Sequence, residues 1–514
     1  MNSVVATETA PDILPDILDI AIIGAGISGI GMAAHLIAKC PGKKYAIIER
    51  RENLGGTWDL FRYPGIRSDS DMHTLGFVFE PWRHEKSIAD GPSILEYLNR
   101  IVDERGIRQN IRFGAKVLGA DWHAADGCWH LSMAGADGQS SVLRARWLYL
   151  GSGYYDYDSP YEAPIAGKAD FAGQIIHPQF WPQNLDYSGK RVVVIGSGAT
   201  AVTIVPSLAA GGAAHVTMLQ RTPTWYATRP AKDGIANFLR RILPDKMAYA
   251  ITRTKNVVMQ DIIFKRARKR PDKVAAFLTK KTQAALGDKY VAADFTPPYA
   301  PWDQRLCLVP DSDLFNAIRA DKADVVTATI DKIDASGIQL SDGRHLEADI
   351  IVTATGLSLA VAGKIALSMD GVPITLADHF YYKGAMFSNI PNFSAVFGYL
   401  NASWTLRADL ISEYVCKVLN HMDAVGANVA TPALADDHGM AEDDIFDFSS
   451  GYIQRGRHLM PRNAVDLPWR LNQDYRQDKA DLARLPIADG VISFTHVGAG
   501  AANDSPPPEA IAAE

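Results

Sequence analysis

The chain has 514 residues, of which 47% are hydrophobic and 21% are charged, and its formal net charge is −6. This length exceeds what one hydrophobic core normally spans and predicts two or three domains. A negative net charge does not attract the phosphate backbone of a nucleic acid, so the composition does not favour nucleic-acid binding. No apolar run reaches the roughly 18 residues of a membrane-spanning helix.

The chemistry of the N-terminus and of the cysteines predicts a cytoplasmic protein. Residues 1–18 lack the basic start and apolar centre of a signal peptide, and we expect them to be flexible. The four cysteines are far apart and form no CxxC, which disfavours a disulfide framework, a zinc ribbon and a redox dithiol. No cluster of His, Cys and carboxylate residues has metal-ligand spacing, so no metal is expected.

A first dinucleotide-binding pattern occupies the start of the chain. The stretch LDIAIIGAGISGIGMAAHLI (18–37) combines an apolar strand, the glycines Gly24, Gly26 and Gly29, and a helical pattern. Such glycines allow a tight turn close to a pyrophosphate, which the helix N-terminus stabilises. The next apolar strand ends at Glu49, and a carboxylate there suits a ribose diol. This site is predicted to bind FAD or NAD.

The same pattern recurs at KRVVVIGSGATAVTIVPSLA (190–209), where Gly196, Gly198 and Ala201 form GxGxxA. The strand that follows ends at Gln220 and Arg221, and Arg221 lies 25 positions after Gly196, as Glu49 does after Gly24. Arginine pairs with a 2′-phosphate, whereas an acid repels one. The second site is therefore predicted to bind NADP.

Two further apolar strands, within 147–154 and 348–356, end in small residues and predict the points where the chain crosses between domains. We expect an α/β fold with two Rossmann-like dinucleotide-binding domains, the second inserted in the first, and a helical insert. The insert holds 16 basic and 5 acidic residues. A solvated cap is the favoured interpretation, with contact to an acidic partner or a membrane surface left open. The predicted parts are a FAD domain (19–155 and 365–490), an NADP domain (156–228 and 290–364), the insert (229–289) and a C-terminal tail with a disordered end (491–514).

Two longer motifs resemble those of the type I Baeyer–Villiger monooxygenases. The first is GGTWDLFRYPGIRSD (55–69), and the second is DFAGQIIHPQFWP (170–182). The stretches PWDQRLCLVP, GYLNASWTL and PWRLNQDY are most similar to the ethionamide-activating branch of that family. The second motif carries the family fingerprint residues Phe171, Gly173, His177, Trp181 and Pro182.

The resemblance implies a chemistry and a set of roles. NADPH reduces FAD, the reduced flavin captures O2 as a C4a-peroxyflavin, and this species inserts oxygen into a ketone or oxidises a thioether to a sulfoxide. Arg305 and Asp69 are implied as the catalytic residues, with the Asp69 carboxylate beside the flavin able to hold the arginine in place, while His177 and its motif form a hinge. Many family members carry Lys where this chain has Gln304, which leaves more of the phosphate recognition to Arg221. The residues implied at FAD are Gly24, Gly26, Ser28, Gly29, Glu49, Gly56, Thr57, Trp58, Asp59, Leu60, Asp69 and Val117. Those implied at NADP are Arg67, Ser68, Gly196, Ser197, Gly198, Ala199, Thr200, Ala201, Val202, Gln220 and Arg221.

Two other functions remain open at this point. An N- or S-oxygenating flavin monooxygenase has similar loops but normally lacks the Trp-Pro pair that closes the fingerprint. A non-oxygenating, redox-sensing flavoprotein would keep both loops and would not need Arg305.

Overall fold

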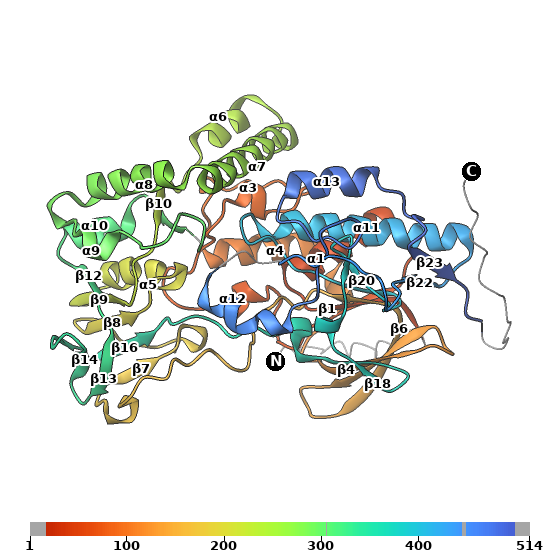
Figure 1. Ribbon diagram of the computed structural model, residues 1–514, viewed down its shortest axis with the longest axis horizontal. Helices are drawn as coiled ribbons and strands as arrows, with labels where there is room; N and C mark the ends of the chain where they lie inside the picture. The colour runs from red at the N-terminus through yellow and green to blue at the C-terminus, as the bar shows by residue number, and fades with distance from the viewer. Residues whose placement is uncertain (1–16, 305, 445–448, 499–514) are drawn as a thin grey trace, which may run out of the picture.

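The structure is a computed structural model that describes residues 17–304, 306–444 and 449–498. It confirms the predicted α/β class, with two separate sheets built around parallel strands (Figure 1). Each sheet contains a glycine loop followed by a helix, as the two sequence patterns predicted.

The first unit is built on a nine-stranded sheet in the order β18-β17-β4-β5-β6-β1-β2-β3, with β21 paired to β6. Strands β6, β1, β2 and β3 are parallel, and β4, β5 and β6 form antiparallel hairpins. The bounds are β1 Leu18–Ile23, β2 Tyr45–Ile48, β3 Ile111–Arg112, β4 Lys116–His123, β5 Cys128–Ala134, β6 Ser140–Leu150, β17 Ala366–Met369, β18 Val372–Ile374 and β21 Phe393–Ala395.

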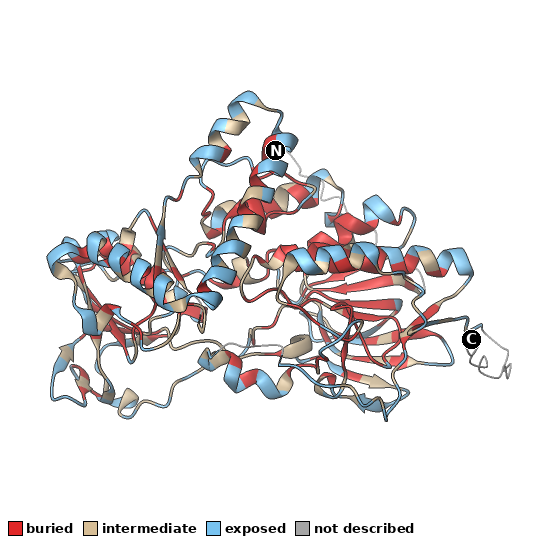
Figure 2. Cartoon of the chain, turned by 45° about the horizontal axis from the view of Figure 1, so that its top comes forward, coloured by how far each residue is buried: buried red, intermediate tan, exposed pale blue. Residues whose placement is uncertain are grey.

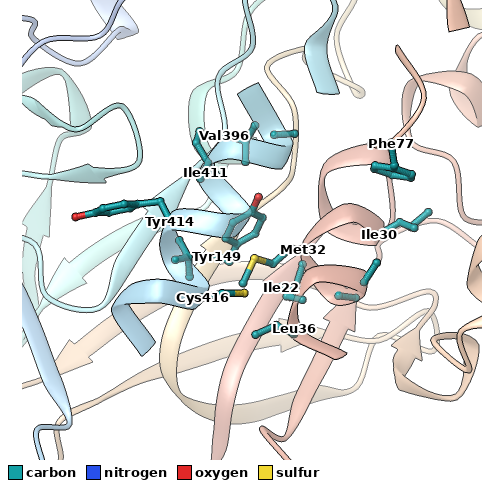
Figure 3. Close-up of a cluster of buried hydrophobic side chains, with 14 of the residues drawn as sticks. Ile22, Ile30, Met32, Leu36, Phe77, Tyr149, Val396, Ile411, Tyr414 and Cys416 are labelled. Atoms are coloured by element: carbon teal, nitrogen blue, oxygen red, sulfur yellow. The ribbon is translucent and has the colours of Figure 1, made fainter. Parts of the chain in front are cut away.

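Helices α1 (Ile27–Lys39), α4 (Gly91–Glu104) and α11 (Trp404–Val425) belong to this unit, and α11 packs along α1. Side chains from β1, α1, β6 and α11 meet in one apolar cluster, although more than 360 residues separate α1 from α11 (Figure 3). Figure 2 shows these strands buried beneath helices whose outer faces are exposed. The return of the chain at α11 therefore completes the core that β1 and α1 begin.

The second unit is an all-parallel, five-stranded sheet in the order β12-β9-β8-β16-β7. Its helices α5 (Ala199–Ala210) and α10 (Asp313–Arg319) contact each other. The strand bounds are β7 Gln174–Ile176, β8 Arg191–Ile195, β9 His215–Gln220, β12 Ala323–Thr327 and β16 Ile350–Thr353. Smaller sheets nearby comprise β10 Tyr226–Arg229, β11 Cys307–Pro310, β13 Ile330–Asp334, β14 Gly337–Leu340 and β15 His345–Glu347.

The predicted insert is helical throughout most of its length. It contains α6 (Gly234–Ile242), α7 (Asp245–Lys269) and α8 (Pro271–Leu286). No helix in the described part of the chain combines the length and the apolar content needed to cross a bilayer. The remaining short helices are α2 Thr57–Leu60, α3 Met72–Leu75, α9 Ala292–Phe295, α12 Gly451–Gly456 and α13 Tyr475–Arg484.

The segment predicted as a C-terminal tail (491–514) begins with a strand. Strand β23 (Ile492–Thr495) pairs with β22 (Val429–Pro432), so ordered structure continues into the segment predicted as a tail. Short strands of this kind carry little signal in sequence because their partner lies more than 50 residues away. Residues 1–16 and 499–514, which were predicted as flexible ends, lie outside the described residues.

Candidate active site

One cavity of about 1010 Å³ is lined by residues from both glycine loops. It also receives the 55–69 motif and the segments that cross between the two units. Of the residues implied as cofactor contacts, those that line it are Gly24, Gly26, Ser28, Glu49, Gly56, Thr57, Trp58, Arg67, Ser68, Asp69, Val117, Gly196, Ser197, Gly198, Ala199, Thr200, Gln220 and Arg221.

The first glycine loop leaves no room for larger residues. Gly24 has a φ of +97°, and a Cβ on it would lie 2.9 Å from the carbonyl oxygen of Gly151. A Cβ on Gly29 would lie 1.9 Å from the carbonyl oxygen of Gly24. Helix α1 begins after Gly26 with no side-chain cap and no acidic residue in its first turn. Its positive end is therefore free to stabilise an anion.

Glu49 lies beside this loop with its carboxylate held in place. Its Oε2 accepts a hydrogen bond from the Ala25 N–H at 2.7 Å, and its Oε1 accepts one from the Arg51 N–H at 2.9 Å. Burial raises the pKa of the Glu49 carboxyl, and these two bonds offset only part of that effect. A carboxylate oriented in this way can accept further hydrogen bonds from a ribose diol.

The second glycine loop repeats this geometry. Gly196 has a φ of +141°, and a Cβ there would lie 2.3 Å from the carbonyl oxygen of Ala354. A Cβ on Gly198 would meet nothing within 4 Å, so the space in front of α5 is open. The first turn of α5 also lacks an acidic residue and a side-chain cap. The N-termini of α1 and α5 thus provide two matched anion sites on one cavity.

Gln220 and Arg221 differ in how free they are to bind a ligand. Gln220 is buried, and its Nε2 donates to the Asp294 carbonyl at 2.7 Å and to Thr327 Oγ1 at 2.9 Å. Arg221 is exposed at the cavity lining. The Gln220 amide is therefore occupied by protein contacts, whereas the charged Arg221 side chain is available to pair with a phosphate.

The 55–69 motif spans the junction between the units. A Cβ on Gly65 would lie 1.9 Å from Ser207 Oγ, so this turn packs directly on α5. Arg67 forms an ion pair with Asp313, the first residue of α10. Burial raises the pKa of Tyr63 to about 12, and a hydrogen bond with Thr200 opposes that shift. Tyr63 is consequently a neutral phenol at the junction near neutral pH.

Several implied cofactor residues lie behind the cavity wall. The Asp59 carboxylate is buried and bound by Arg51 and Arg62, with an Arg51 Nε to Oδ2 distance of 2.8 Å. These contacts hold the short helix α2, which in turn places Thr57 and Trp58 at the cavity. The other implied residues outside the lining are Gly29, Leu60, Ala201 and Val202. Gly29 lies in α1, Ala201 and Val202 lie in α5, and Leu60, at the end of α2, packs in the apolar core of the second unit.

The fingerprint segment is part of the second unit and is not a free linker. Residues 174–176 form β7, the edge strand beside β16. A Cβ on Gly173 would lie 2.3 Å from the Asp349 carbonyl oxygen and 2.8 Å from the Phe171 ring. Trp181 packs against the core of this unit, whereas Pro182 is exposed. The spacing of the motif therefore reflects an edge strand followed by a 3-10 turn.

His177 follows β7 and contacts the second crossing segment. Its Nδ1 accepts a hydrogen bond from the Gln179 N–H at 3.2 Å. Burial lowers the pKa of His177, and the nearby Gly356 backbone opposes the shift. The ring is neutral near neutral pH, and its Nε2 is buried with no hydrogen-bond partner among the described residues. The hinge role implied by the resemblance stays a prediction.

We expect His177→Ala to keep the fold and the flavin but to release more peroxide per NADPH consumed. Removing a hinge contact would disturb the domain movement that repositions the nicotinamide cofactor during turnover. Removing a proton-transfer group would instead slow turnover by about a hundredfold or more. Stopped-flow spectra and peroxide yield measure this, with His215→Ala as the control on β9. Normal coupling in the His177 variant would exclude the hinge role.

The structure adds residues that the motifs did not predict. Trp404 Nε1 donates to Ser28 Oγ at 2.7 Å, and the Trp404 ring stacks on Tyr154 with a centroid distance of 5.1 Å. Tyr157 hydrogen-bonds Thr57. These aromatic residues line the cavity and orient two of the implied FAD contacts. Trp404 lies in the GYLNASWTL stretch, but no local pattern indicated that it would reach α1.

Arg305 lies outside the described residues, and its role stays a prediction. Its neighbours Gln304 and Leu306 line the cavity.

Within the described ranges of the chain, one candidate metal cluster occurs that the sequence spacing did not predict. The potential ligand atoms of His123, Asp126 and His130 lie within 4.8 Å of one another on the β4–β5 hairpin. His123 pairs with Cys128 and Asp121 pairs with His130 across the hairpin, so the two histidines are diagonal neighbours. Their rings stack with a centroid distance of 3.8 Å. The cluster does not belong to the cavity lining.

Comparison with protein families and curated proteins identifies extensive similarity. Residues 21–292 match the family described as pyridine nucleotide-disulphide oxidoreductase. The chain is 49% identical over 478 residues to the FAD-containing monooxygenase EthA of Mycobacterium tuberculosis, covering 93% of this chain and 97% of that protein. It is 46% identical over 490 residues to the probable FAD-binding monooxygenase AlmA of Acinetobacter sp, covering 95% and 98%.

Solved structures share the fold at lower identity. An open crystal structure of cyclohexanone monooxygenase aligns with a TM-score of 0.74 and 21% identity, covering 94% of this chain and 100% of that chain. Oxidized steroid monooxygenase bound to NADP aligns with a TM-score of 0.71 and 23% identity, covering 93% and 100%. The two sheets and their connection are thus shared across nearly the whole chain.

Proposed function

The chain belongs to the FAD-containing monooxygenases, and from this membership we propose that it is an NADPH-dependent Baeyer–Villiger monooxygenase. It would convert a ketone, O2, NADPH and a proton into an ester or lactone, NADP⁺ and water. It would also transfer oxygen to thioethers. The observation that carries the proposal is the single cavity bounded by two anion-binding helix N-termini, one beside Glu49 and the other beside Arg221.

The first half of the cavity fits FAD. The N-terminus of α1 would stabilise its pyrophosphate, and the Glu49 carboxylate would accept from its ribose. Ser28 and Thr57 are oriented by Trp404 and Tyr157. When bound, FAD would supply the redox chemistry that takes electrons from NADPH and activates O2, the source of the transferred oxygen atom.

The second half fits NADPH. The N-terminus of α5 would hold the pyrophosphate, and the open space in front of Gly198 allows its close approach. Arg221 would pair with the 2′-phosphate. The Arg67–Asp313 ion pair and the contact of Gly65 with α5 hold the two units together where the two cofactors would meet.

Aromatic side chains in the cavity wall would help to exclude water during oxygen transfer. Tyr154, Trp404 and Tyr399 line the cavity, and Tyr154 and Trp404 are stacked. An apolar wall that keeps water out would limit the release of the activated oxygen as peroxide, and it would strengthen nearby electrostatic contacts. In this proposal Arg305 supplies a fixed positive charge for the oxygen that becomes negative during transfer.

We expect Arg221→Ala to raise the NADPH concentration needed for half-maximal rate by about tenfold to a hundredfold. The charge-assisted contact to the 2′-phosphate contributes roughly 1.5–3 kcal/mol, which corresponds to that range. NADH has no 2′-phosphate, so its use should change little. Steady-state kinetics with both coenzymes measure the effect, and the exposed Arg319→Ala is the control. An equal loss with both coenzymes would reject phosphate recognition by Arg221.

The proposed function is tested by NADPH consumption with a cyclic ketone, a thioether and a tertiary amine, with products identified by mass. We expect a lactone and a sulfoxide, each one oxygen atom heavier than its substrate. Oxidation of the amine alone would favour an N-oxygenating enzyme. Consumption with no organic product would favour the redox-sensing alternative.

We also propose a cytoplasmic location. The four cysteines, all among the described residues, form no disulfide, which is compatible with a reducing compartment.

A further inference from the structure

Positive charge is concentrated in one segment of the chain. Residues 229–289 contain 16 basic and 5 acidic residues, whereas the remainder contains 36 basic and 53 acidic residues. The protein is therefore acidic except around helices α6, α7 and α8. Such a separation orients a molecule in an electric field and brings this segment toward an anionic surface.

Helix α6 carries an exposed apolar stripe. Ile235, Phe238 and Ile242 are 56%, 59% and 59% exposed, and their spacing of three and four residues places them on one face. Ala236 is the buried residue of this helix. A short helix that points its bulky apolar side chains outward has no core of its own to cover them.

Helix α7 carries a second stripe. Met247, Ile251 and Ile262 are 51%, 45% and 52% exposed, at spacings of four and eleven residues that return to the same face. Counting the whole insert, 9 of the 19 exposed large apolar side chains found among the described residues lie between positions 235 and 277. This density is far above that of isolated apolar residues on a protein surface.

The buried contacts that anchor α7 determine which of its side chains are exposed. Tyr249 Oη donates to the Phe77 carbonyl at 2.9 Å, and Arg253 Nη1 donates to the Gly76 carbonyl at 2.6 Å. These buried contacts fix which face of α7 points inward. Figures 1 and 2 both show α6 and the adjoining part of α7 at the outer edge of the molecule.

We propose that this surface, formed by the exposed stripes of α6 and α7 and the surrounding basic residues, docks the protein on an anionic lipid bilayer. Apolar side chains enter the boundary between headgroups and acyl chains, and lysine and arginine pair with anionic headgroups. Arg241 lies beside the end of the α6 stripe and Lys246 lies just before the α7 stripe, and both are exposed. In the proposed orientation their charges lie in the headgroup layer. A second copy of the chain fits less well, because pairing the same surface would place basic residues against basic residues.

The first test uses the FAD-loaded protein and co-sedimentation with vesicles of phosphatidylcholine and phosphatidylglycerol. The unmodified protein should sediment with these vesicles. The double variant Phe238→Ser/Ile242→Ser should bind at least about tenfold more weakly, because two anchoring side chains are lost. The matched control is Val142→Ser/Val372→Ser, which removes side chains of 68% and 67% exposure from the first sheet and should bind normally.

The second test addresses charge. Arg241→Glu/Lys246→Glu should lower binding by about tenfold or more, and added salt should weaken the binding of the parent. Lys332→Glu reverses an exposed charge on β13, away from this surface, and should change binding little. Vesicles of phosphatidylcholine alone should bind poorly.

Three outcomes of the vesicle experiments would overturn the proposal. They are the absence of sedimentation with anionic vesicles, equal binding to neutral vesicles, and equal binding by the apolar double variant. A concentration-dependent dimer that the Phe238→Ser/Ile242→Ser change abolishes in the absence of lipid would assign the surface to a second copy instead. These readouts do not depend on catalysis, and neither α6 nor α7 contributes a residue to the cavity lining.

Discussion

Replacing Glu49 by arginine should give a protein that folds but is purified without FAD. The parent side chain is buried and accepts hydrogen bonds from the backbone N–H groups of Ala25 and Arg51. An arginine would place its N–H donors against these backbone N–H donors and bring an unpaired charge into the site proposed for the flavin ribose. The flavin-to-protein absorbance ratio measures the loss, and circular dichroism checks the fold.

A more conservative substitution at position 49 tests FAD binding with less risk of disturbing the fold. Glu49→Gln preserves the size of the side chain but removes one acceptor and the charge, and it should weaken FAD binding by about tenfold to a hundredfold. Glu52→Arg is the matched control, because Glu52 is exposed three residues away. Retention of FAD by both Glu49 variants at the parental level would show that the first site has been assigned wrongly.

The pH dependence of stability should distinguish the parent from Glu49→Gln in the FAD-free form. Burial raises the pKa of Glu49 above its ordinary value of 4.5, so the ionised carboxylate costs stability in the folded protein. The variant should gain most relative to the parent above the raised pKa. That gain should shrink as the pH falls and the parental carboxyl takes up its proton. Melting temperatures across this range measure it, and a constant difference would contradict the assigned shift.

Arg305→Ala should abolish nearly all oxygenated product while FAD stays bound. Neither glycine loop is altered, so cofactor binding persists, but a fixed positive partner for the transferred oxygen is lost. Removing one preorganised group of this kind typically costs about a hundredfold to a thousandfold in rate. The remaining NADPH consumption should end as peroxide. Product and peroxide per NADPH measure this outcome.

Two further variants define the role of Arg305. Arg305→Lys retains the charge but lacks the planar guanidinium, so we expect little rescue. The exposed Arg470→Ala should behave as the parent. Near-parental product from Arg305→Ala would mean that the implied role belongs to another residue.

The parts of the site that sequence predicts are those governed by local backbone geometry. Glycines at positions 24, 29 and 196 are dictated by positive φ or by contacts too close for a Cβ, so the loops can be recognised from spacing alone. Glu49 and Arg221 follow because each sits at the end of the second strand of a repeated unit. The predicted family and fold class are confirmed, whereas the ligand roles of these residues stay predictions.

The remaining features depend on contacts between distant segments. Trp404 reaches Ser28 across 376 positions, and Arg67 pairs with Asp313 across 246. Asp59 matches the motif that the resemblance placed at FAD, yet in the structure it anchors Arg51 and Arg62. A motif shows that a residue type recurs at a position, and only the three-dimensional arrangement shows whether its side chain points toward the ligand or supports the wall behind it.

The most direct measurement is a single-turnover reaction of the NADPH-reduced protein with a cyclic ketone under ¹⁸O2. We expect one labelled oxygen atom in the lactone for each NADPH oxidised, with the second labelled atom recovered in water. Unlabelled lactone, or oxidation of NADPH with all of the label in peroxide, would contradict the assignment of this chain as an oxygen-inserting enzyme.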